Sequence, residues 1–234
     1  QFPLLKSILY KINGKNIYHS PTDMGVNMIG NCISDDEIVK EAAKKEIVRR
    51  YYNALCNIRK GSGSEVEVHK IELLMQQLSI SAKDIRPCVA FALEKEEETD
   101  APAVAIELND GRIVTGKTSS LLGASSAALL NALKKLGGID DSYLLLPIEI
   151  IEPIQKLKIG NLGNRTPRLH ADEILIALAI AATTDPVAAT AMEQLPKLRG
   201  CEAHTSVIVS SVDKGVYRKL GLNLTCEPVY ATKK

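Results

Sequence analysis

Cys201 and His204 form the most reactive-looking cluster in the sequence, within Arg-Gly-Cys-Glu-Ala-His. A cysteine nucleophile with histidine as its base could attack a carbonyl group, and the same two side chains are also zinc ligands. Both chemistries require the backbone to turn, because residues three apart in an extended segment point to opposite faces. We take this pair as candidate catalytic residues; a zinc site would also need a distant ligand such as Cys226 or His170, and no metal site is assigned.

Residues 111–118, Gly-Arg-Ile-Val-Thr-Gly-Lys-Thr, match the G-x-x-x-x-G-K-[ST] pattern of phosphate-binding loops. Three β-branched residues occupy the middle of the match, and such residues prefer an extended backbone. The preceding Asn-Asp-Gly is typical of a hairpin turn. We therefore favour a β-hairpin with strands at 103–108 and 112–116, followed by a helix over 124–136.

Two helix starts are candidate sites for anion binding. Residues 117–120 lie between the predicted strand and helix, where backbone N–H groups favour negative charge. Residues 20–27 begin another helix, with a serine cap and proline at the first helical position. Simple capping explains the second pattern equally well. The candidate anion-binding residues are Ser20, Thr22, Asn27, Lys117, Thr118, Ser119, Ser120 and, in a polar loop, Asn164, while Asp23 and His204 are candidates for proton transfer.

The composition excludes several classes of protein. The 234 residues carry a formal net charge of +1, and only 4% are aromatic, which argues against a nucleic-acid partner. The longest apolar run, residues 174–182, is too short to cross a bilayer, so we expect no membrane partner. Five cysteines without a Cys-x-x-Cys pair indicate a reducing, cytoplasmic environment. The start at Gln1, without Met, suggests a fragment or a processed product.

Two segments of different character are expected. Residues 1–98 are mainly helical, with a long helix over 34–60 that can act as a spine. An acidic run at 94–100, ending at Pro102, is the best linker. Residues 101–234 have the pattern of a mixed α/β domain.

The pattern of the second segment predicts further strands and a weak repeat. Residues 133–138 and 195–200 align as Leu-Lys-Lys-Leu-Gly-Gly and Leu-Pro-Lys-Leu-Arg-Gly. Two such helix-to-strand units would give a pseudo-symmetric, three-layer-like α/β domain, although ordinary helix ends produce the same match. The expected strands are 142–146, 205–209 and 222–226, and the expected helices are 148–158, 169–182, 186–195 and 213–220.

Several longer phrases resemble one family. They are SPTDMGVN (20–27), GKTSSLLGASSAALLNAL (116–133), NLGNRTPRLHADEILIAL (161–178), EQLPKLRGCEAH (193–204) and LGLNLTCEP (220–228). Together they resemble the bacterial uncharacterised family known as domain of unknown function eighteen forty-six. The resemblance implies members about twice this length, with a glycine-rich G-P-G-S-G-K segment upstream that has no counterpart here. It thus implies a C-terminal half whose partner is the upstream half of the same protein. Some members are labelled ATP-dependent peptidase, but the sequence has no H-E-x-x-H motif.

A second resemblance concerns the fold alone. A strand, a turn, Gly-Arg-x-x-Thr-Gly and a helix of small residues are similar to the opening of cytidine-deaminase-like domains. In those domains a His or Cys followed by Ala-Glu binds zinc and moves protons. Residues 124–127, Ala-Ser-Ser-Ala, supply neither group, so the resemblance implies a zinc-free domain without deaminase chemistry.

Three functions fit these patterns. The first is the C-terminal half of a cytoplasmic enzyme that binds a phosphate-bearing or nucleotide ligand through Lys117 and its neighbours. The second is a hydrolase or peptidase that depends on Cys201 and His204. The third is a non-catalytic module that forms a homo-oligomer through the helix at 34–60. No cofactor can be named from the sequence.

Overall fold

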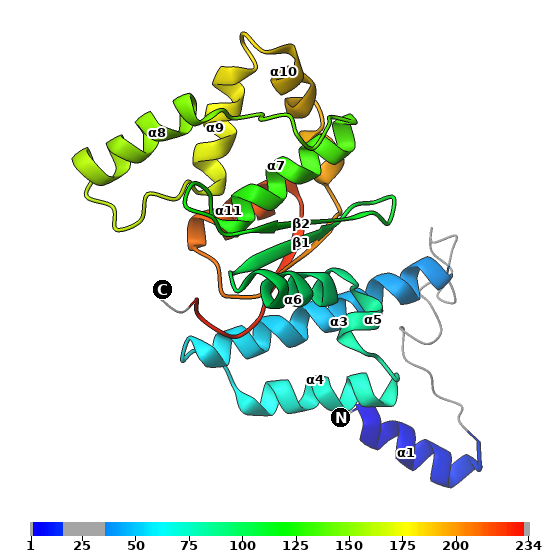
Figure 1. The fold of residues 1–234 in the computed structure, drawn as a ribbon. Helices are drawn as coiled ribbons and strands as arrows, with labels where there is room; N and C mark the ends of the chain where they lie inside the picture. Colours follow the sequence, from blue (N-terminus) through cyan, green and yellow to red (C-terminus); the bar gives the residue numbers. More distant parts are fainter. Residues whose placement is uncertain (1, 16–35, 232–234) are drawn as a thin grey trace.

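The computed structural model describes residues 2–15 and 36–231, and these form helices around one small sheet (Figure 1). The helices are α1 (Phe2–Asn13), α3 (Asp36–Arg59), α4 (Glu65–Gln77), α5 (Ala82–Ile85), α6 (Cys88–Thr99), α7 (Ala124–Gly137), α8 (Ile148–Lys156), α9 (Ala171–Ala181), α10 (Pro186–Met192) and α11 (Ser211–Leu220). The strands are β1 (Ala103–Glu107), β2 (Ile113–Lys117), β3 (Glu202–Thr205) and β4 (Asn223–Cys226). A π-helical turn (Leu157–Asn161) extends α8, and a 3₁₀ turn (Leu195–Leu198) precedes β3. The predicted mixed α/β class is confirmed.

The four strands form a mixed sheet in the order β2-β1-β3-β4. β1 is antiparallel to both of its neighbours, whereas β3 and β4 are parallel and are connected through α11. The predicted hairpin is confirmed: Gly111 has φ +83°, a conformation that favours glycine, and its N–H donates to the Leu108 carbonyl at 2.9 Å. Because β2 pairs with β1, residues 113–117 form the second strand of the hairpin and do not have the conformation of a phosphate-binding loop.

Gly116, the glycine of the Gly-Lys-Thr sequence, is required by packing. α7 crosses β2 so closely that a Cβ atom at this position would lie 2.2 Å from the backbone nitrogen of Ala128. A glycine in a strand interior often marks such a close approach of another backbone. The residue that suggested a phosphate loop therefore allows a helix to lie on the sheet.

Helices cover both faces of the sheet. Figure 1 shows α7, α9 and α11 on one side of the strands and α6 and α3 on the other. Alternate residues of β1 face these two layers: Val104 and Ile106 belong to the core that includes α7, and Ala105 packs with Cys88 and Ala92 of α6. This arrangement is the expected three-layer organisation.

The acidic run at 94–100 is not a linker. Residues 94–99 complete α6, and Asp100 ends the helix with a left-handed backbone, φ 48°. Val89 and Ala92 of the same helix are completely buried. The run is acidic because much of it lies on the solvent side of a helix that packs on the sheet.

The expected strands at 142–146 and 205–209 are wrong. Leu145 and Leu146 are buried as irregular chain, and the strand near the second region is β3, which begins three residues earlier. Of the two helix-to-strand units that the predicted repeat requires, only the second, which leads into β3, is present. Its two halves share a helix-ending turn, with Gly138 at φ +63° and Gly200 at φ +86°.

The other predicted elements of the second segment are present. β4 and α11 agree with 222–226 and 213–220, and Asp185 caps α10 by accepting the Val187 N–H at 2.9 Å. α3 agrees with the helix expected at 34–60, whose first two residues lie outside the described residues. The likeness to cytidine-deaminase-like domains is not confirmed. At the start of α7, the segment that corresponds to the zinc-binding residues of those domains, Ser126 Oγ donates to the Leu169 carbonyl at 2.8 Å.

Candidate functional site

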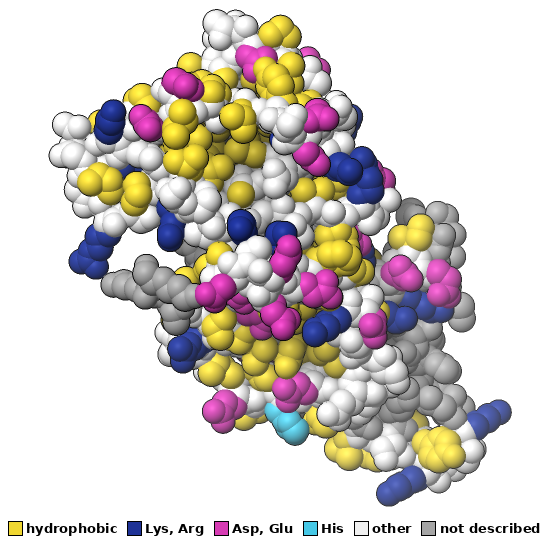
Figure 2. Space-filling view, in the orientation of Figure 1, with side chains coloured by type: hydrophobic (Ala, Val, Ile, Leu, Met, Phe, Trp, Pro, Cys, Tyr) yellow, Lys and Arg dark blue, Asp and Glu magenta, His cyan; other side chains and the backbone are white. Residues whose placement is uncertain are grey.

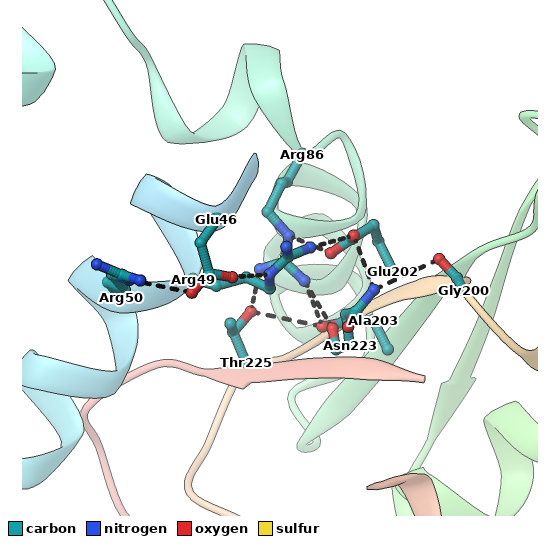
Figure 3. Close-up of polar contacts among 9 residues, drawn as sticks. All are labelled: Glu46, Arg49, Arg50, Arg86, Gly200, Glu202, Ala203, Asn223 and Thr225. Carbon is teal, nitrogen blue, oxygen red and sulfur yellow. Dashed lines mark hydrogen bonds and ion pairs between the residues drawn. The ribbon is translucent and has the colours of Figure 1, made fainter. Parts of the chain in front are cut away.

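A buried arginine joins the helical layer to the sheet (Figure 3). Arg86 Nε donates to Glu202 Oε2 at 2.9 Å, and Nη2 donates to the carbonyl oxygens of Ala203 and Asn223 at 3.0 and 2.9 Å. Nη1 donates to Thr225 Oγ1. Because all three nitrogens bond to β3 and β4, this guanidinium is committed to the protein, and we interpret it as structural.

A second arginine extends the network to α3. Arg49 Nη1 lies 2.5 Å from Glu202 Oε1, and Arg49 Nε donates to Glu46 Oε2 at 2.9 Å (Figure 3). Asn223 Nδ2 donates to the same Glu202 carboxylate at 3.1 Å. The buried carboxylate therefore has two cationic partners and one amide, which compensate for its removal from water.

Cys201 and His204 are not brought together. His204 faces α3, where its ring centroid lies 4.7 Å from that of Tyr52 and its Nδ1 lies 2.8 Å from Thr225 Oγ1. Cys201 belongs to the core that includes α7, and its Sγ contacts the Lys197 carbonyl at 3.6 Å. Burial lowers the pKa of His204 and raises the pKa of Cys201. The proposed thiol–imidazole pair is wrong, because Cys201, just before β3, and His204, within it, lie on opposite sides of the extended chain.

Residues 117–120 form a tight connection between β2 and α7. The Thr118 N–H donates to the Pro102 carbonyl at 2.8 Å, and the Ser119 N–H donates to the Leu122 carbonyl at 2.9 Å. Ser119 Oγ accepts from the N–H groups of Leu121 and Leu122. Two of the backbone donors that an anion would need are thus already bonded, and the anion-binding role of Lys117, Thr118, Ser119 and Ser120 stays a prediction.

The remaining predicted residues are dispersed. Asn164 is exposed in the loop after the π-helical turn, and its N–H donates to the Lys158 carbonyl at 2.9 Å. The other candidates, Ser20, Thr22, Asp23 and Asn27, lie outside the described residues. Within residues 2–15 and 36–231, no group of three or more His, Cys, Asp and Glu side chains is placed to hold a metal ion.

A pocket of about 370 Å³ lies between α3 and α11. α11 contributes a stripe at helical spacing i, i+3, i+4 and i+7, and the edge strand and α3 complete the lining. Two of these residues, Lys214 and Arg218, are exposed cations whose side chains have no hydrogen-bond or ion-pair partner in the described part of the chain. The full lining is Asn53, Ser211, Lys214, Gly215, Arg218, Leu222 and Leu224.

The opposite face of α11 holds an oriented imidazole. Asp213 Oδ2 lies 3.2 Å from His170 Nδ1 and accepts from Ser210 Oγ at 2.8 Å, while Oδ1 accepts the Ala171 N–H at 2.9 Å. The hydrogen bond with Asp213 raises the pKa of His170. Burial opposes ionisation of Asp213, but the hydrogen bonds from His170, Ala171 and Ser210 outweigh it and lower the pKa of this carboxyl. This is the orientation that a histidine acid or base requires.

His170 is accessible for such a role. About a third of its side chain (34%) is exposed, and among the described residues its Nε2 has no hydrogen-bond partner. Its backbone N–H donates to Glu173 Oε2 at 2.7 Å, so Glu173 caps the start of α9. The same carboxylate binds the buried Lys158 ammonium at 2.7 Å. A charged pair therefore supports the segment that carries the imidazole.

The sequence patterns predicted neither the pocket stripe nor the contact between His170 and Asp213. The pocket stripe was accessible to it, because residues 211, 214, 215 and 218 fall at helical spacing within or next to the helix predicted at 213–220. The contact of His170 with Asp213 joins residues 43 apart, and no local pattern announces it.

The chain matches two family models. The one described as "Domain of unknown function DUF1846, C-terminal" matches residues 84–234, and the one described as "Domain of unknown function DUF1846, N-terminal" matches residues 1–79. The family resemblance is therefore confirmed. It is also corrected, because the chain carries sequence of both family domains and not of the C-terminal domain alone.

Proteins of known sequence agree with this assignment. The UPF0371 protein of Corynebacterium efficiens is 54% identical over 99% of this chain and 47% of its own length. The UPF0371 proteins of Corynebacterium urealyticum and Streptococcus pneumoniae (strain JJA) are each 53% identical, over 99% and 98% of this chain and 46% of their own lengths. The chain thus spans about half the length of these relatives.

Proposed function

This chain belongs to the DUF1846 family, whose function is not established, and we propose that it binds a phosphate-bearing small molecule in the pocket between α3 and α11. The supporting observation is that Lys214 and Arg218 line this pocket without an acceptor in the described residues. The anion site expected at residues 117–120 is thereby moved to α11. The volume of about 370 Å³ falls in the range of about 300–1,000 Å³ that small-molecule pockets occupy.

The lining defines the kind of ligand. An ammonium and a guanidinium one helical turn apart can hold one phosphate group, and the guanidinium can present two parallel donors to its oxygens. The Asn53 amide and the Ser211 hydroxyl add neutral hydrogen bonds, and Leu222 and Leu224 supply apolar surface. A phosphate ester with an apolar or aromatic portion, such as a nucleotide, satisfies all three kinds of group.

Thermal unfolding of the protein with AMP, ATP or inorganic phosphate tests this function. At about one hundred times its Kd, a ligand adds about 2.7 kcal/mol of stability. We expect Lys214→Gln and Arg218→Gln to lose this stabilisation. Lys219→Gln is the matched control, because it removes the same charge from the same helix at a residue that does not line the pocket.

Two results would contradict the assignment. If Lys117→Gln abolishes ligand stabilisation and Lys214→Gln does not, the anion site returns to the segment after β2. If none of the three phosphate compounds stabilises the wild-type protein, the binding function is wrong.

A second function, catalysis by proton transfer, is favoured by the His170–Asp213 contact at 3.2 Å. An imidazole held by a buried carboxylate can take or give a proton at Nε2, which is worth about 10²–10⁴-fold in rate. The measurement is phosphate release from nucleotides and sugar phosphates. Loss in both His170→Gln and Asp213→Asn supports the role, whereas full activity in His170→Gln eliminates it.

We also propose self-association in the cytoplasm. The predicted oligomerisation helix, α3, buries Val48 and Tyr52 within the chain. A different surface supports assembly better: Figure 2 shows hydrophobic side chains gathered over α8 and α9, where Ile176 and Ile180 are more than half exposed. Sedimentation velocity of Ile176→Glu tests the association.

Free thiols at four of the described cysteines support a reducing compartment, which is the basis for proposing the cytoplasm. No described helix is long and apolar enough to span a bilayer.

A further inference from the structure

Two cysteines from distant parts of the chain meet beside β4. Cys56 lies on α3, and its Sγ is 3.2 Å from the carbonyl oxygen of Cys226, the last residue of β4. The two cysteines fall in regions matched by different family models, residues 1–79 and 84–234. Their exposed fractions are 8% and 9%, whereas those of Cys88 and Cys201 are 0% and 1%. This pair is therefore more accessible than the other two described cysteines.

The surroundings favour one thiol and one thiolate. The neighbouring Cys56 thiol lowers the pKa of Cys226, against the opposing effect of burial. The Val209 N–H and the ammonium groups of Lys214 and Lys60 stabilise the same thiolate. The neighbouring Cys226 and burial raise the pKa of Cys56. Because the Cys56 thiol donates its proton to the Cys226 carbonyl oxygen, Cys226 is the nucleophile and Cys56 is the adjacent thiol that reacts second.

We propose that Cys56 and Cys226 form a reversible disulfide when the protein meets a hydroperoxide. The Cys226 thiolate attacks one oxygen of hydrogen peroxide, the O–O bond breaks, and the departing hydroxide takes the Cys56 proton and leaves as water. The Cys56 thiolate then attacks the sulfur of the Cys226 sulfenic acid, forming the S–S bond and releasing hydroxide, which is protonated by solvent. Hydrogen peroxide is reduced to water, and two thiols are oxidised to one disulfide.

The bond would tie α3 to the edge strand next to the pocket. Asn53 precedes Cys56 by one helical turn, and Leu224 lies on the same side of β4 as Cys226, two residues earlier. Oxidation therefore links two walls of the pocket directly. The disulfide itself does not depend on the proposed ligand function.

The test uses the folded chain with Cys32→Ser, so that the one cysteine outside the described residues cannot exchange. After hydrogen peroxide treatment and alkylation with N-ethylmaleimide, we expect the free-thiol count to fall by two, and dithiothreitol to restore it. Peptide mass spectrometry should find the segments around Cys56 and Cys226 joined. The Cys201→Ser variant, the matched control, should also lose two thiols.

Single variants identify the order of the steps. Cys56→Ser should accumulate a sulfenic acid on Cys226 that dimedone traps, whereas Cys226→Ser should leave Cys56 unreacted. Alkylation of Cys88 and Cys201 in the same samples reports any unfolding. An unchanged thiol count in the folded protein, or a disulfide that joins other cysteines, would overturn the inference.

Discussion

Arg86 and Glu202 are 116 residues apart in the chain and form a buried ion pair, with Nε 2.9 Å from Oε2. Arg86 follows α5, and Glu202 begins β3, so the pair fastens the connection between the helical layer and the sheet (Figure 3). Arg49 adds a second cation from α3. A single buried carboxylate therefore holds two separate helical segments to the sheet.

Replacing Arg86 by methionine should strongly destabilise the fold. The change leaves the Glu202 carboxylate with one arginine and removes the donors to the carbonyls of Ala203 and Asn223. We expect a loss of about 3–5 kcal/mol in the free energy of unfolding, measured by urea denaturation. Arg50→Ala is the control, because its exposed pair with Glu46 should contribute no more than about 1 kcal/mol. Equal effects of the two changes would contradict the structural role of Arg86.

Gly116→Ala should also destabilise the protein, for a steric reason. The added methyl group would meet the α7 backbone 2.2 Å away, so the helix must move off β2. Overpacking of this kind costs about 1–3 kcal/mol or more. Gly215→Ala is the matched change, since no atom lies within 4 Å of its added Cβ and alanine favours a helix by about 1 kcal/mol. Thermal unfolding should move in opposite directions for the two variants.

The His170–Asp213 contact should make stability depend on pH. The hydrogen bond raises the folded-state pKa of His170 above its ordinary value of 6.5. Its stabilising contribution is complete below about pH 6.5 and is lost as the pH rises through the folded-state pKa. The lowered pKa of His204 acts in the opposite direction. Because His204 is present in both proteins, the difference between wild type and His170→Gln isolates His170.

Urea unfolding from pH 5 to pH 9 measures this difference. We expect the stability of the wild type relative to His170→Gln to fall as the pH rises above the ordinary pKa. Nuclear magnetic resonance titration should give His170 a higher pKa than the same residue in Asp213→Asn. An equal pKa in both proteins would show that the carboxylate does not stabilise the imidazolium.

Cys201 should resist alkylation in the native protein. Its side chain is buried in the core that includes α7, and burial raises the pKa of the thiol. We expect iodoacetamide to modify this residue only at the rate of unfolding, and Cys201→Ala to retain any turnover found. Rapid modification of Cys201 accompanied by loss of activity would instead support a hydrolase that uses this cysteine as its nucleophile.

Short-range patterns predicted much of the fold. The Asn-Asp-Gly turn, the β-branched residues of β2 and the amphipathic pattern of α3 each act through neighbouring residues, and their elements are present. The apolar residues 142–146 were misread as a strand. Apolar sequence indicates burial, and Leu145 and Leu146 are buried, but as irregular chain.

The candidate sites depend on contacts between residues far apart in the sequence. Asp213 orients His170, and Asn53 faces Lys214 and Arg218, because α11 packs against α9 on one side and lies near α3 on the other. Cys201 and His204 are three residues apart, yet Cys201 packs in the core that includes α7 and His204 packs against Tyr52 of α3. Backbone conformation follows from local sterics and hydrogen bonding, whereas the partner of a buried polar group is whichever group the packed layers place within reach.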